Sequence, residues 1–84
     1  MVPKVIIHCK GKEELDSLLK ILEDIGYAWN GDGIKATKIS KVAGNYIHVY
    51  DNEYGKVIRY SSVCPDQQFL EFESIKDNIT EILK

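Results

Sequence analysis

The sequence predicts an α+β fold: a small, mostly antiparallel sheet with two helices packed on one face, in the order β-α-β-β-β-α. Three observations support this class. Leucine and isoleucine recur at helical spacing near the start of the chain, two later runs alternate with the period of a strand, and the last stretch again has helical spacing. With 84 residues, 44% of them hydrophobic, the chain is expected to form a single domain, residues 1–84, with a thin core.

The first third of the chain predicts a strand, a helix and a second strand. Residues 4–9 are apolar on both faces, as in a central strand. Residues 13–25 carry leucines at helical spacing and acidic residues in the first turn, which indicates an amphipathic helix. Gly26 follows it, where a left-handed residue ends a helix. Residues 27–30 then predict a short aromatic strand, closed by a glycine-rich turn.

The middle of the chain predicts a hairpin. Residues 46–50 alternate, so that Ile47 and Val49 point to the core and the intervening Tyr46, His48 and Tyr50 point to the other side. Residues 56–61 return as the partner strand after a loop at 51–55. Residues 34–39 are expected to form a further strand or a lysine-bearing sheet edge.

The end of the chain predicts a last short strand and a helix. The strand covers residues 69–72. A capping box that begins at Ser74 and ends at Asp77 is expected to open the C-terminal helix. The inward residues of this helix are Ile75, Ile79, Ile82 and Leu83.

Charge is distributed unevenly. The formal net charge of −2 argues against general nucleic-acid binding. Residues 34–60 nevertheless hold five basic residues against two acidic ones, a local charge of +3. This excess suits an anionic ligand of modest size, and the alternative is a set of ordinary solvated lysines. The basic residues are Lys35, Lys38, Lys41, Lys56 and Arg59.

The sequence offers little for catalysis or metal binding. Cys9 and Cys64 are too few for a disulfide scaffold, and they are expected to be reduced thiols of a cytoplasmic protein. Phosphate-binding glycine loops, nucleophile elbows and metalloprotease helices are absent. A thiol site of Cys64 with His48 is disfavoured, and Cys64 is expected to be a small apolar filler. Neighbouring His8 and Cys9 point to opposite faces, which disfavours zinc. We therefore expect a protein that is not an enzyme and needs no metal or cofactor.

Aromatic residues are the main candidates for a binding site. Tyr27 and Trp29 lie two positions apart and share one face of a strand, either as part of the core or as a platform for a flat ligand. Tyrosines in a row on an exposed strand face are typical of binding surfaces. Arg59 is expected to contact a phosphate or carboxylate, and its alternative is an exposed ion pair with Asp51 or Glu53. The predicted ligand-binding residues are Tyr27, Trp29, Asn30, Lys35, Lys38, Tyr46, His48, Tyr50, Arg59 and Tyr60.

A resemblance covers most of the chain. The acidic helix, the run Gly26-Tyr27-Ala28-Trp29-Asn30, the Tyr-x-x-Val-Tyr pattern of residues 46–50 and the late Ile-Arg-Tyr-Ser of residues 58–61 resemble small phage and prophage accessory proteins. Some proteins of that kind are sponges that sequester cyclic nucleotides of CBASS and Thoeris defences, usually as oligomers with pockets between subunits. The resemblance thus implies a sponge in the host cytoplasm, and it supplies no ligand motif residue by residue.

Two functions follow as hypotheses. The first is a non-catalytic, homo-oligomeric protein that sequesters a small anionic nucleotide, with aromatic rings stacked on bases and Arg59 on phosphate. The second is a protein-interaction module that inhibits a host protein through the tyrosine face or an exposed strand edge. Neither hypothesis involves a membrane.

Overall fold

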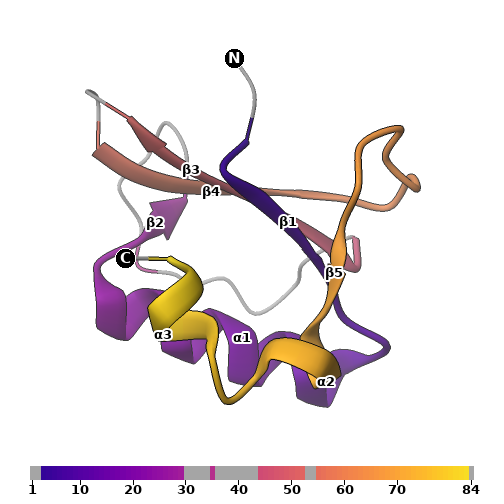
Figure 1. Cartoon of the computed structure of the whole chain (residues 1–84), viewed down its shortest axis with the longest axis horizontal. Helices are drawn as coiled ribbons and strands as arrows, with labels where there is room; N and C mark the ends of the chain where they lie inside the picture. Colours follow the sequence, from indigo (N-terminus) through magenta and orange to yellow (C-terminus); the bar gives the residue numbers. More distant parts are fainter. Residues whose placement is uncertain (1–2, 30–34, 36–43, 53–54, 84) are drawn as a thin grey trace.

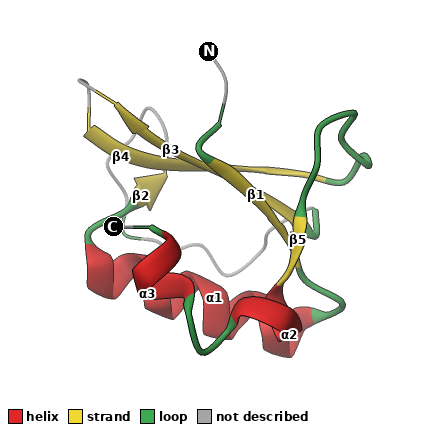
Figure 2. Cartoon of the chain, viewed as in Figure 1, coloured by secondary structure: helices red, strands yellow, loops and turns green. Residues whose placement is uncertain are grey.

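A computed structural model describes residues 3–29, 35, 44–52 and 55–83. The fold is α+β, with a five-stranded sheet on one side and three helices on the other (Figures 1 and 2). The strands lie in the spatial order β2-β4-β3-β1-β5. Their bounds are β1 (Val5–His8), β2 (Ala28–Trp29), β3 (Tyr46–Asn52), β4 (Gly55–Ser61) and β5 (Leu70–Glu71).

The helical layer covers one face of the sheet (Figure 2). Helix α1 (Lys12–Ile25) buries the leucine stripe that its spacing predicts, and Gly26 ends it in the left-handed region at φ 113°. The short helices α2 (Phe72–Ile75) and α3 (Ile79–Ile82) lie against α1. No helix in the described ranges is long and apolar enough to cross a membrane.

The core lies between the two layers. Its sheet side is formed by alternate residues of β1, β3 and β4, represented by Ile7, Ile47 and Ile58, each of them inaccessible to solvent. Its helix side is formed by the leucines of α1 and by Phe72 and Ile79 of the C-terminal helices. The alternation predicted for the hairpin is therefore confirmed, and it leaves the other sheet face for polar side chains.

The prediction of one C-terminal helix beginning at Ser74 is wrong. Helix α2 begins two residues earlier, with Ser74 inside it, and the chain turns at residues 76–78 before α3. Asn78 has a non-helical backbone, and its N–H donates to the carbonyl of Ile75 at 2.8 Å. Asparagine readily leaves helices for such turns. The break still directs Ile75 and Ile79 into the core, as predicted.

The sheet is mixed, and most of its residue pairs are antiparallel, as predicted. Strand β3 pairs antiparallel with β1 and with β4, whereas both edge strands pair in parallel, β5 with β1 and β2 with β4. The edge pairs arise because α1 returns the chain to one edge, and the segment 62–69 carries it from β4 to the other. The strand or edge predicted at 34–39 lies outside the described residues, except that Lys35 bridges Ala28.

Candidate functional site

The face of the sheet opposite the helices carries most of the predicted binding residues, and we call it the polar sheet face. It is built in rows, because paired strands place side chains side by side. The middle row runs Ile6–His48–Arg59 across β1, β3 and β4. An end row runs Glu71–His8–Tyr46–Ser61 across β5, β1, β3 and β4. Tyr50 stands on the other side of the middle row.

The middle row contains a buried polar atom without a partner. Ile6 is only 2% exposed, and Nε2 of His48 beside it is buried and has no hydrogen-bond partner among the described residues. Burial and, secondarily, the charge of Arg59 lower the pKa of His48 from its ordinary value. The imidazole is therefore neutral at pH 7, and its unpaired nitrogen is unfavourable for folding.

Arg59, the only arginine of the chain, is exposed next to this histidine. Its guanidinium carbon lies 5.8 Å from the centroid of the Tyr50 ring, within range of a cation–π contact. No carboxylate of the described part pairs with it. The alternative ion pair with Asp51 is not formed, since that carboxylate approaches Lys4 at 3.9 Å instead. Glu53 lies outside the described residues.

The end row is an aromatic and charged cluster. Nδ1 of His8 lies 2.7 Å from a carboxylate oxygen of Glu71. The His8 ring lies on Tyr46 with centroids 4.7 Å apart, and Phe69 meets Tyr46 edge-on at 5.2 Å. A hydrogen bond with the Cys64 thiol, followed by burial and by nearby negative charge, raises the pKa of Tyr46. The Tyr46 ring is thus already part of a three-ring cluster, since His8 and Phe69 also contact each other with centroids 5.8 Å apart.

Sequence reasoning missed three members of this face. His8 was considered only as a zinc ligand, whereas Phe69 and Glu71 come from a segment with no evident link to residues 46–50. They join it because β5 pairs in parallel with β1, so that Glu71 stands beside His8. Of these three residues, strand periodicity could have indicated only His8. Because the apolar Ile7 faces the core, the neighbouring His8 must point to the opposite face.

Tyr27, Trp29 and Tyr60 belong to the other side of the sheet. Tyr27 and Trp29 are buried in the core, with Trp29 only 4% exposed. Tyr60 is exposed and meets the Trp29 ring edge-on at 5.7 Å. The predicted set of ten therefore does not converge on one site. Of the rest, Lys35 is exposed on the bridge to β2, and Asn30 and Lys38 lie outside the described residues.

The two cysteines have opposite environments. Cys9 is buried in the core, and its pKa is raised to about 12 by burial and by the charges of Glu14 and Glu71. Cys64 is exposed, so its prediction as an apolar filler is wrong. Within the described residues, no three His, Cys, Asp or Glu side chains come together as a metal site.

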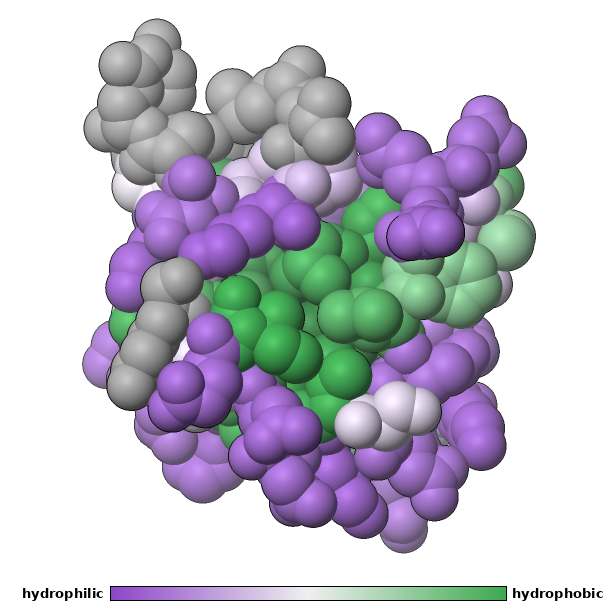
Figure 3. Space-filling model, viewed as in Figure 1, coloured by the Kyte–Doolittle hydropathy of each residue, from purple (hydrophilic) through white to green (hydrophobic). Residues whose placement is uncertain are grey.

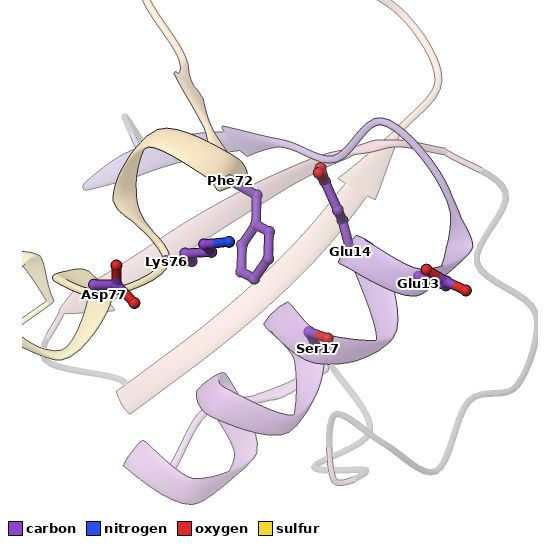
Figure 4. A pocket seen from close by; sticks show the side chains of 6 residues that line it. All are labelled: Glu13, Glu14, Ser17, Phe72, Lys76 and Asp77. Atoms are coloured by element: carbon purple, nitrogen blue, oxygen red, sulfur yellow. The ribbon is translucent and has the colours of Figure 1, made fainter.

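A shallow pocket of about 400 Å³ lies between α1 and the C-terminal segment (Figure 4). Phe72 points towards α1 at its centre, and Glu13 and Glu14 stand on the α1 side. Ser17, Lys76 and Asp77 complete the lining. Three carboxylates against one lysine make this pocket unfavourable for an anion, and none of the predicted binding residues lines it.

The polar sheet face therefore offers a fork-shaped cation, a neutral imidazole and flanking tyrosines. This combination can hold an anionic group next to a planar ring, because guanidinium donors match phosphate oxygens and aromatic or guanidinium planes stack on bases. No protein-family model, curated protein or solved structure matches the chain.

Proposed function

We propose that the chain is a non-catalytic binding protein that sequesters a small anionic nucleotide on its polar sheet face. The observation that carries the proposal is the position of Arg59. It is exposed, has no carboxylate partner in the described part of the chain, and is held over Tyr50 beside His48. An arginine in these conditions is prepared for an external anion, because no carboxylate of the described residues competes for its donors.

The ligand would make different contacts with Arg59 and with Tyr46. Phosphate oxygens would accept hydrogen bonds from Arg59, and a base would stack on the guanidinium plane that already covers Tyr50. Tyr46 would serve as a fixed wall, since His8 and Phe69 already pack against its ring. Tyr46 would therefore position the ligand and would not stack on its base.

The biological setting of this proposal comes from the resemblance to phage and prophage accessory proteins. In that setting the nucleotide is a signal of host defence, the protein acts in the host cytoplasm, and sequestration requires no catalytic group. A homo-oligomer would enlarge the shallow sheet face into a pocket, which a chain of this size needs in order to enclose a nucleotide.

A thermal-shift screen against cyclic dinucleotides, cyclic trinucleotides and cyclic ADP-ribose isomers tests the proposal. We expect one of them to raise the melting temperature by several degrees, because a ligand that binds only the folded state stabilises it. Arg59→Ala should abolish that rise and leave the ligand-free melt almost unchanged, since the side chain is exposed.

Two control variants sharpen this test. Arg59→Lys keeps the charge but loses the planar fork, so it should restore only part of the rise. Lys20→Ala removes an exposed cation from α1, on the other side of the molecule, and should keep all of it. An Arg59→Ala protein that is stabilised as much as the native chain would contradict the proposal. Light scattering after size exclusion reports whether the binding form is an oligomer.

A second candidate function is a protein-interaction module. Hydrophobic residues reach the surface between the sheet and helices α2 and α3 (Figure 3). At the β5 edge Leu70 is 38% exposed, and Val63 in the preceding segment is 71% exposed. Such apolar surface favours a protein partner. A pull-down that recovers one host protein, together with no thermal shift by any nucleotide, would select this function over the first.

A further inference from the structure

We propose that the polar sheet face takes up one proton when it binds a phosphodiester anion, and that His48 receives this proton. The inference rests on the proposed function and adds to it a specific coupling between ligand binding and pH. It starts from the neighbours of His48, because these decide which charge the imidazole carries before and after an anion arrives.

The groups that face His48 include no available carboxylate among the described residues. On β4 its row neighbour is Arg59, and on β1 it is the apolar Ile6. Along β3 the flanking groups are Tyr46 and Tyr50. One row away, His8 is held by Glu71 at 2.7 Å, so the carboxylate of that row is already committed to the other histidine.

The free protein therefore keeps His48 neutral. The ring has a buried, unpaired nitrogen and one charged row neighbour, which is positive. Both conditions oppose protonation, in agreement with the lowered pKa of this group. No described group on this face offsets the burial of the ring or the repulsion from Arg59.

A bound phosphodiester reverses this balance. The charge of Arg59 acts on His48, so an anion held by Arg59 also lies within electrostatic reach of the imidazole. An opposite charge at about 4–6 Å favours the charged form of a titratable group. The anion also screens the repulsion from Arg59. A proton then passes from solvent to the imidazole, and the resulting positive charge attracts the bound phosphate.

The coupling has a definite sign. Since the bound state holds one proton more than the free state, affinity rises as pH falls, by at most about tenfold per pH unit. The rise is confined to the interval between the bound and the free pKa of His48. Cyclic dinucleotides are suitable probes, because phosphodiesters do not titrate in this interval, whereas phosphomonoesters do, near about pH 6.

Isothermal titration calorimetry with the cyclic di- and trinucleotides of the screen tests the inference. Proton uptake is measured near pH 7 in two buffers with different heats of ionisation. We expect a positive uptake of at most one proton for the native chain. His48→Gln keeps a hydrogen-bonding amide but cannot take up a proton, so its uptake should vanish. Lys20→Ala, a change on the exposed side of α1 and away from this face, should keep the uptake.

Nuclear magnetic resonance provides a readout that needs no variant. The native chain has only two histidines, so two ring C–H signals are followed against pH with and without the nucleotide. The midpoint of one signal should move upwards on binding. Binding without proton uptake, or uptake unchanged in His48→Gln, overturns this inference and leaves the proposed function standing. Binding of no cyclic nucleotide of the screen overturns both.

Discussion

Neighbouring residues of a strand have different surroundings, because their side chains point to opposite faces of the sheet. His8 and Cys9 follow each other in the sequence, yet one stacks on Tyr46 at the polar sheet face and the other is buried in the core. The same alternation separates Arg59 from Ile58. A chemical role at this scale therefore depends on the face as much as on the residue type.

The two thiols should differ sharply in reactivity. Cys9 is buried, and its pKa is raised to about 12, so the nucleophilic thiolate is scarce and inaccessible at pH 8. Cys64 is exposed. We expect one thiol to react with a disulfide reagent in the native protein and both in denaturant.

The Cys64→Ser variant is the control for this prediction. It should show no fast-reacting thiol until it unfolds. Rapid modification of a thiol in native Cys64→Ser would contradict the buried position of Cys9.

Elements with strong periodicity were predicted well, and short ones were not. The strand at β1, the helix at α1 and the hairpin of β3 and β4 lie close to their predicted bounds, because apolar spacing and turn residues agree there. The C-terminal helix was predicted in one piece, since Ile75, Ile79 and Leu83 have helical spacing. Spacing alone does not show that Asn78 leaves the helix between them.

The end of α1 offers a test at the scale of one element. Gly26 has φ 113°, and its N–H donates to the carbonyls of Leu22 and Glu23. Gly26→Ala should destabilise the protein by about 1–2 kcal/mol, because a Cβ is unfavourable in the left-handed region. Chemical denaturation measures this loss.

Gly26→Asn is the matched variant for the helix end. Asparagine tolerates the left-handed region better than alanine, so its loss should be clearly smaller. Equal losses for the two variants would indicate that side-chain bulk matters here, and not backbone conformation.

The whole molecule depends on one thin core between two layers. Among the described residues, fifteen buried ones from the sheet, the three helices and the segments next to them form its cluster. A chain of 84 residues has few others to compensate, because small domains bury a smaller fraction of their surface. Local damage to the core should therefore affect the entire fold in one cooperative transition.

Leu18→Ala tests this dependence. Leu18 is fully buried on α1, so its truncation should cost about 2–5 kcal/mol from lost burial and the resulting cavity. Leu70→Ala makes the same chemical change at the β5 edge, where the residue is 38% exposed, and should cost less than about 1 kcal/mol. Urea unfolding of both variants gives the comparison. Similar losses would contradict the placement of the core.

The candidate site was predicted only in part. Strand periodicity sufficed to predict that Tyr46, His48, Tyr50 and Arg59 share one face, of which only Arg59 is exposed and the other three are half-buried. The sequence left two alternatives for Tyr27 and Trp29, either burial in the core or a platform for a ligand. The packing of α1 over the sheet places both residues in the core. Glu71 was not anticipated, because residues 8 and 71 meet only through the parallel pairing of β1 with β5.

The sequence by itself determined the class of fold, the main helix, the hairpin and the face to which each hairpin residue points. These properties are local, since the period of 3.6 or 2 residues and the turn chemistry act within a few positions. The tertiary structure alone decided the strand order, the parallel edges, the split of the C-terminal helix, and which aromatic residues are core. Such outcomes depend on contacts between distant segments, whose free energies no local pattern contains.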